Sequence, residues 1–188
     1  MANSLKAKFP ELGRIFGETP DTLYARQRAF VAAGILESTP GRGPGSGVRA
    51  TPETLADFLI GMLSHASLAD NVAFAKAIAR AIPGSDKCQL TGMTTFKKAL
   101  AAIISDKSLA DRVNEIRITI NGGFAVILYD GSSSEATLKG LAKPAKLTRQ
   151  PESSVFTGKI AKGPGLRFDA AILPETLRKL ADVIRETD

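Results

Sequence analysis

The spacing of apolar residues changes once along the chain, near Asn114, and this change constrains the fold more than any other feature. Before Asn114, apolar residues recur every three or four positions, which is the period of an amphipathic helix. One such set is Leu55, Phe58, Leu59, Met62 and Leu63. After Asn114, apolar and polar residues alternate through 115–131, which is typical of strands with one buried face. The sequence therefore predicts an α+β fold with a helical first half and a small antiparallel sheet in the second.

Capping residues, prolines and glycines predict where the helices begin and end. Thr19-Pro20 and Thr51-Pro52 each place a capping hydroxyl before a proline, which suits the first position of a helix. Gly34 can adopt the left-handed conformation that ends the first of these helices. Further helices are expected over about 67–82, over about 94–104 and from about Pro174 onward.

The second half carries the signals of a sheet followed by a terminal helix. Asn121-Gly122 lies between two alternating runs and predicts a hairpin turn. Two more strands are expected within 154–161 and 166–172. The helix from Pro174 has an apolar stripe, which predicts that it covers one face of the sheet.

Composition limits the chemistry that this chain can perform. The 188 residues include 25 Lys and Arg against 19 Asp and Glu, a net charge of +6, which favours an anionic partner without requiring one. Cys88 is the single cysteine and His65 the single histidine. An internal disulfide is therefore excluded, and zinc clusters and histidine-dependent catalytic sites are disfavoured. No metal, cofactor or catalytic residue is predicted.

The apolar segments are short. The first residues contain no apolar run of signal-peptide length, and runs such as ALAAII (99–104) cannot span a bilayer. We therefore expect a cytoplasmic protein with no membrane partner.

The segment TPGRGPGSGVRAT (39–51) contains four glycines and two arginines. A phosphate-binding loop requires a strand before it and a helix directly after it, and a Walker loop also requires a lysine. Here a helix precedes the segment and no lysine follows, which disfavours a nucleotide site. Short strand-compatible stretches, 33–39 and 47–51, flank the glycines, so a β-hairpin is predicted.

Helix, helix and hairpin is the order of a winged helix-turn-helix, and residues 12–43 resemble the DNA-binding domain of GntR-type bacterial transcriptional regulators. The residues that carry the resemblance are Leu12, Phe16-Gly17, Thr19, Thr22, Leu23, Gly34-Ile35-Leu36 and Gly41-Arg42-Gly43. They match the family pattern without a gap. The resemblance implies that the helix from Pro20 reads DNA and that the hairpin is the wing.

The same helix has the surface that a DNA-reading helix needs. A helical wheel buries Leu23, Phe30 and Val31 with Gln27 among them, and it places small residues on the opposite side. Small side chains let a helix lie deep in the major groove. The predicted DNA-binding residues are Thr19, Asp21, Thr22, Tyr24, Arg26, Arg28, Arg42 and Arg49.

These residues have different expected roles. Thr22 and Arg28 would meet base edges or phosphates, and Tyr24 and Arg26 the flanking backbone. Asp21 would either cap the helix or accept a hydrogen bond from cytosine. The wing arginines, Arg42 and Arg49, would reach phosphates or a minor groove.

Three parts are predicted: a winged helix-turn-helix over 1–66, a helical connector or dimerisation region over 67–113, and an α+β domain over 114–188. Together they favour a sequence-specific DNA-binding protein that is not an enzyme, namely a bacterial or prophage transcriptional regulator acting as a homodimer on double-stranded DNA. A protein partner or a small-molecule effector for the C-terminal half stays open. The alternatives are a DNA-handling accessory factor for excision, packaging, replication or partition, and a nucleic-acid enzyme.

Overall fold

The computed structural model describes residues 4–41, 46–64, 68–119, 124–130, 151–157 and 169–185. In these ranges the helices are η1 (Leu5–Lys8), α1 (Phe9–Phe16), α2 (Pro20–Ala32), α3 (Pro52–Leu63), α4 (Leu68–Ala79), α5 (Phe96–Ser105), α6 (Lys107–Arg112) and α7 (Pro174–Arg185). The strands are β1 (Ile82–Pro83), β2 (Val113–Thr119), β3 (Phe124–Asp130), β4 (Pro151–Thr157) and β5 (Asp169–Ile172). The described ranges thus combine helices with a five-stranded antiparallel sheet, which confirms the predicted α+β class.

The helical and strand-bearing parts meet where the apolar period changes, because α6 ends at Arg112 and β2 begins at the next residue. The predicted hairpin is formed by β2 and β3, with Thr119 opposite Phe124. Its proposed turn, Asn121-Gly122, lies outside the described residues. The strands expected within 154–161 and 166–172 correspond to β4 and β5, so the main elements of the sheet were predictable.

One strand was not predicted. The strand order is β1-β4-β3-β2-β5, and β1 places Ile82 opposite Thr157 and Pro83 opposite Phe156. The sequence indicated only a helix break at this point. Two residues are too few to show an alternating pattern, and a proline is tolerated because β1 is an edge strand.

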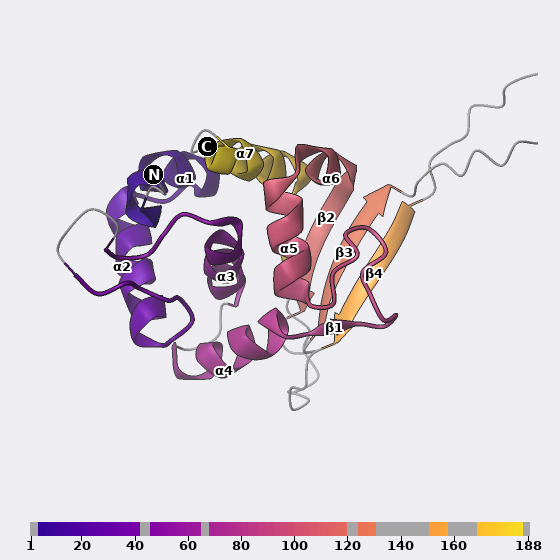
Figure 1. Ribbon diagram of the computed structural model, residues 1–188, viewed down its shortest axis with the longest axis horizontal. Helices are drawn as coiled ribbons and strands as arrows, with labels where there is room; N and C mark the ends of the chain where they lie inside the picture. Colours follow the sequence, from indigo (N-terminus) through magenta and orange to yellow (C-terminus); the bar gives the residue numbers. More distant parts are fainter. Residues whose placement is uncertain are drawn as a thin grey trace, which may run out of the picture.

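The elements are arranged in layers, with the sheet at one end of the molecule and α2 at the other (Figure 1). Helix α5 packs on the sheet, and the ring of Phe96 meets that of Phe156 at 5.3 Å between centroids. Helix α3 lies on the other side of α5, and α2 packs beyond α3. Any DNA-reading surface on α2 is therefore separated from the sheet by two helices.

Helix α7 connects parts that are distant in sequence. The residues of its predicted apolar stripe are all buried: Leu177, Leu180, Ala181 and Ile184. The helix packs against α5, α6 and α1, and it also contacts β2. The predicted packing of this helix on the sheet is thus found at β2, beside its contacts with the other helices. The buried apolar residues form one cluster from Leu5 to Ile184, with members in all three predicted parts, and the division into domains stays a prediction.

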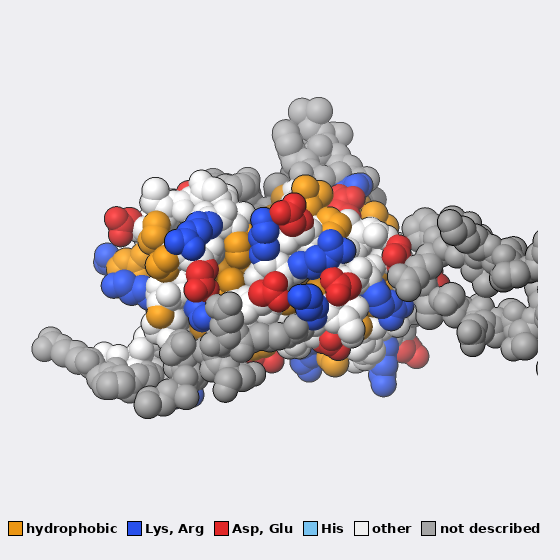
Figure 2. All heavy atoms as spheres, turned by 90° about the horizontal axis from the view of Figure 1, so that it is seen from above, with side chains coloured by type: hydrophobic (Ala, Val, Ile, Leu, Met, Phe, Trp, Pro, Cys, Tyr) orange, Lys and Arg blue, Asp and Glu red, His pale blue; other side chains and the backbone are white. Residues whose placement is uncertain are grey.

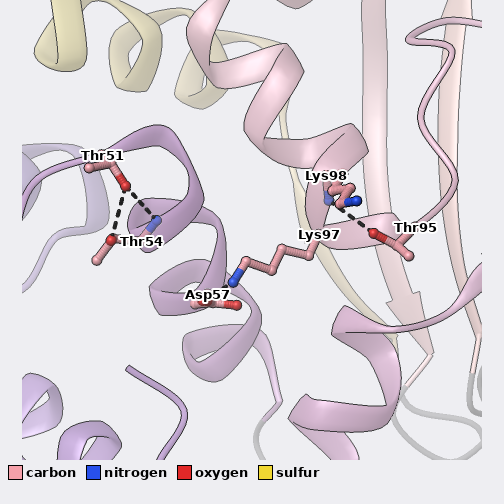
Figure 3. A network of polar contacts seen from close by, with 6 residues as sticks. All are labelled: Thr51, Thr54, Asp57, Thr95, Lys97 and Lys98. Carbon is pink, nitrogen blue, oxygen red and sulfur yellow. Dashed lines mark hydrogen bonds and ion pairs between the residues drawn. The ribbon is translucent and has the colours of Figure 1, made fainter. Parts of the chain in front are cut away.

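An ion pair joins α3 to α5 in the middle of these layers (Figure 3). Lys97 Nζ lies 2.5 Å from Asp57 Oδ2, and the Asp57 side chain is only 15% exposed. Burial raises the pKa of Asp57 above its ordinary value, although the hydrogen bond and the charge of Lys97 oppose that rise. Thr51 and Thr95 cap the helices that carry the two side chains. Lys97 therefore stabilises the ionised form of Asp57.

Replacing Lys97 by methionine should lower the free energy of unfolding by about 1–3 kcal/mol at neutral pH, because a buried carboxylate loses its partner. Lys98→Met is the matched control, since the Lys98 side chain is exposed and only its backbone is bonded to Thr95. Chemical denaturation of both variants measures the difference. Equal stabilities of the two variants would contradict this role for the ion pair.

The loss in free energy of unfolding caused by Lys97→Met should also depend on pH. A raised pKa in the folded state means that ionisation of Asp57 costs stability as pH rises through that pKa. Without Lys97 the pKa rises further, so the deficit of Lys97→Met should shrink as pH falls toward the ordinary aspartate value of 3.8.

Candidate nucleic-acid interface

A tight turn joins α1 to α2. Gly17 follows α1 in the left-handed conformation with φ of 69°, and Glu18 N donates to Gly13 O at 3.0 Å. A Cβ atom on Gly13 would lie 2.6 Å from Glu18 O, so the turn can fold back on α1 only because residue 13 is glycine. The angle between α1 and α2 depends on this contact.

The N-terminus of α2 is capped by Thr19, as predicted. Thr19 Oγ1 accepts from Thr22 N at 3.2 Å and lies 2.8 Å from Thr22 Oγ1, while Pro20 occupies the first turn. Asp21 is exposed and is not the cap, because Thr19 already fills that position. A carboxylate in the first turn is nevertheless favourable, since it faces the positive end of the helix dipole.

The C-terminus of α2 is closed by the predicted glycine. Gly34 has φ of 65°, Ile35 N donates to Phe30 O at 2.9 Å, and Gly34 N donates to Val31 O at 3.0 Å, which is the Schellman pattern. Lys76 of α4 adds a cation here, with Nζ 3.3 Å from Ala33 O. Both ends of α2 are therefore held.

One side of α2 is buried against its neighbours. Leu23 and Phe30 are buried as predicted, and Val31 is half-buried. The Phe30 ring packs on Gly61 of α3, where an added Cβ would approach it to 2.8 Å. Gln27 is only 8% exposed, and its Oε1 has no hydrogen-bond partner among the described residues. Gln27, which the helical wheel placed among the apolar residues of this side, is thus buried in the structure as well.

The opposite side of α2 faces solvent. Its exposed residues follow each other at intervals of four, three and four: Asp21, Ala25, Arg28 and Ala32. Thr22 and Ala29 flank this stripe and are half-buried. Arg28 makes no hydrogen bond or ion pair with any described residue. This solvent-facing side, which we call the α2 stripe, presents one guanidinium between small side chains.

An arm formed by residues 36–41 and 46–49 lies beside α2. Thr39 and Gly47 exchange backbone hydrogen bonds of 3.0 and 2.7 Å, so the two segments are antiparallel. Val48 is buried, and its carbonyl accepts from Leu5 N at 2.8 Å, which ties the arm to the start of the chain. Arg49 is exposed at the returning segment. Arg42, a predicted DNA-binding residue, lies outside the described residues.

Two other predicted residues make contacts within the protein. Arg26 Nη2 lies 2.8 Å from Glu18 Oε1, so this ion pair stabilises the turn before α2. Tyr24 is half-buried, and Lys6 Nζ lies 4.4 Å from the centre of its ring. A DNA contact by either side chain would have to share it with these partners.

Sequence reasoning missed three contributors. Arg14 is exposed in the last turn of α1, and its position near the turn was the available signal. Glu18 and Lys76 act through partners in space. Lys76 is 43 residues from the helix end that it caps, so no local pattern could have indicated it.

The charge of the chain is not concentrated around α2. Residues 1–66 contain seven Lys and Arg against six Asp and Glu. On the face over α1, α6 and α7, basic and acidic side chains are interleaved (Figure 2). The ion pairs of α6 and α7 are Lys107–Asp182, Arg178–Asp111 and Lys179–Glu175. Any attraction of an anion by α2 and the arm is therefore local, through individual arginines.

No protein-family model, curated protein or solved structure matches the chain. In the described ranges no three His, Cys, Asp or Glu residues gather where they could hold a metal ion. No helix of the part that the structure describes is long and apolar enough to cross a membrane.

Gly13→Ala should destabilise the protein, although alanine normally stabilises a helix by about 0.5–1 kcal/mol relative to glycine. The added Cβ would collide with the carbonyl of Glu18, so we expect a loss of about 1–3 kcal/mol in thermal or chemical unfolding. Arg14→Ala, at the exposed neighbouring position, should change stability by less than about 0.5 kcal/mol. A more stable Gly13→Ala variant would show that the turn is not fixed by this contact.

Proposed function

We propose that the chain is a sequence-specific DNA-binding protein, a cytoplasmic bacterial or prophage transcriptional regulator that reads duplex DNA with α2 and the arm as a winged helix-turn-helix. The observation that carries the proposal is the α2 stripe. A helix held at both ends, with one unpaired arginine between exposed alanines, has the shape and the chemistry that the major groove accepts.

Arg28 has the position for reading a base. Its neighbours on the stripe, Ala25 and Ala32, are small enough to let the helix axis approach the base edges. An arginine can then bond both O6 and N7 of guanine. Because Arg28 has no partner among the described residues, no ion pair is lost on binding.

Arg49 and Arg14 suit the backbone instead. Arg49 is exposed on the arm and Arg14 is exposed next to the turn, so they could contact phosphates on either side of α2. Arg26, through Glu18, would orient α2 rather than read a base. Thr19 and Thr22 hold the start of α2, the end that enters the groove in helix-turn-helix proteins.

The resemblance of residues 12–43 to GntR-type regulators supports the same proposal. Two glycines of the matched pattern, Gly17 and Gly34, both adopt left-handed conformations. They are needed at the turn before α2 and at its end, where side chains would be strained. The pattern therefore coincides with the backbone that the proposal requires.

The first test is binding to duplex DNA at increasing salt concentration. If four to six phosphates are neutralised, log K should fall against log salt with a slope of about −4 to −5, because bound counterions are released. Fluorescence anisotropy with a labelled duplex measures it. A binding constant that does not change with salt, or no binding at low salt, would remove the proposal.

The second test separates base reading from phosphate contact. Arg28→Ala should weaken binding to the preferred site by about 1–3 kcal/mol and relax the preference at one base pair. Arg49→Ala should weaken binding to all sequences by similar factors and reduce the salt slope by about one. The preferred site would first be selected from a random duplex library.

Arg80→Ala is the matched control, since Arg80 is an exposed arginine that follows α4 and lies two residues before β1. It should bind as the unmodified protein does. If Arg28→Ala and Arg80→Ala have equal affinities and equal site preferences, the α2 stripe does not read DNA.

A further inference from the structure

Two charged side chains lie on the α2 stripe. Asp21 is in the first turn of α2, and Arg28 follows seven residues later, so both lie on the same side of the helix. Neither side chain has a hydrogen bond or an ion pair with another described residue. The neighbouring acid, Glu18, differs from Asp21 because Arg26 neutralises it at 2.8 Å. One exposed surface of α2 therefore offers a partner both an acid and a base.

The cap of α2 does not use the carboxylate of Asp21. Thr19 Oγ1 accepts from Thr22 N at 3.2 Å and lies 2.8 Å from Thr22 Oγ1, so the capping position is filled. Asp21 is exposed beside this cap. Its carboxylate oxygens are therefore free to accept hydrogen bonds from a molecule that lies against the stripe.

The first turn of α3 has the same local arrangement. Thr51 Oγ1 accepts from Thr54 N at 3.2 Å and lies 3.0 Å from Thr54 Oγ1 (Figure 3). Pro52 follows this cap, and the exposed Glu53 occupies the position that Asp21 has in α2. The two helices differ in their surroundings, because six of the twelve residues of α3 are buried against three of the thirteen of α2. Only α2 combines such an acid with the exposed stripe.

A carboxylate and a guanidinium select different bases in the major groove. A carboxylate accepts a hydrogen bond from the N4 amino group of cytosine, whereas guanine presents the acceptors O6 and N7, which repel it. A guanidinium has the opposite preference and bonds both acceptors of guanine. Asp21 and Arg28 are thus complementary to opposite members of a G·C pair.

The separation of the two side chains along α2 limits which base pairs they can reach together. Seven residues of α-helix rise about 10.5 Å, and base pairs are stacked about 3.4 Å apart. Where a helix reads successive bases, as in zinc fingers, its contacts recur about once per helical turn. Asp21 and Arg28 are two turns apart, with the small Ala25 between them. They therefore suit base pairs about two or three steps apart.

We propose that the α2 stripe selects duplex sites with two G·C pairs about two or three steps apart, one presenting cytosine to Asp21 and the other presenting guanine to Arg28. This inference rests on the proposed function and names the sequence feature that α2 reads. Asp21 also acts against other sequences, because its carboxylate is repelled by purine acceptors and by phosphates. It lowers the affinity for random DNA and so increases discrimination.

Exchanging the acid for its amide tests which base Asp21 reads. Sites are selected from a random duplex library with the unmodified full chain and with Asp21→Asn. Asparagine bonds N6 and N7 of adenine, so the variant should prefer adenine to cytosine at one position by about fivefold or more and keep the guanine. Arg28→Ala should relax the guanine, about two or three steps away, and keep the cytosine.

Glu53→Gln is the matched control, since it removes the same charge from a first turn with the same cap. It should select the same site as the unmodified protein. A random duplex provides a second readout, because a loss of structure would weaken binding to it. Asp21→Asn should instead bind the random duplex about twofold more tightly than Glu53→Gln does, since the lost charge faced the DNA. Circular dichroism verifies that the variants are folded.

The outcomes separate this inference from the proposed function. If Asp21→Asn selects the same site as Glu53→Gln, Asp21 does not read cytosine, and the proposed function stands if Arg28→Ala still relaxes a guanine. If the positions that depend on Asp21 and Arg28 are more than about four base-pair steps apart, one helix does not read both. If the unmodified protein binds no duplex or prefers no site, the proposed function fails and this inference fails with it.

Discussion

Helix α5 has to be buried on nearly all sides, and the rest of the structure follows from this requirement. Its buried residues are Phe96, Ala99, Leu100, Ala101, Ile103 and Ile104. A helix that is apolar around most of its circumference needs neighbours on opposite sides. The sheet packs on one side of α5 and α3 on the opposite side, and α7 covers a third side. The three-layer arrangement is the way in which this chain removes α5 from water.

The position of α5 also separates α2 from the sheet. The α2 stripe lies beyond α3, and the sheet lies on the opposite side of α5. The ion pair between Lys97 and Asp57 connects α5 to α3. Helix α7 provides a second connection, since it packs on α1 as well as on α5. These packed helices therefore connect the sheet to α2.

Much of the candidate site was predictable because it is local. The cap by Thr19, the left-handed Gly34 and the exposed Arg28 each depend on residues within one or two helical turns. The contacts of Arg26 with Glu18 and of Tyr24 with Lys6 were not predicted, because one depends on the geometry of a turn and the other on a cation 18 residues away. The wheel placed these side chains correctly around the helix without showing what they touch.

The sequence by itself determined the fold class, the ends of α2 and the side of α2 that faces solvent, because each of these follows from periodicity and capping over short stretches. Only the tertiary structure decided how the elements pack on one another. β1 joins the sheet through two residues, and α7 packs on α5, α6 and α1 as well as on β2. These outcomes depend on how elements far apart in sequence compete for the same apolar surface, and that competition has no local signature.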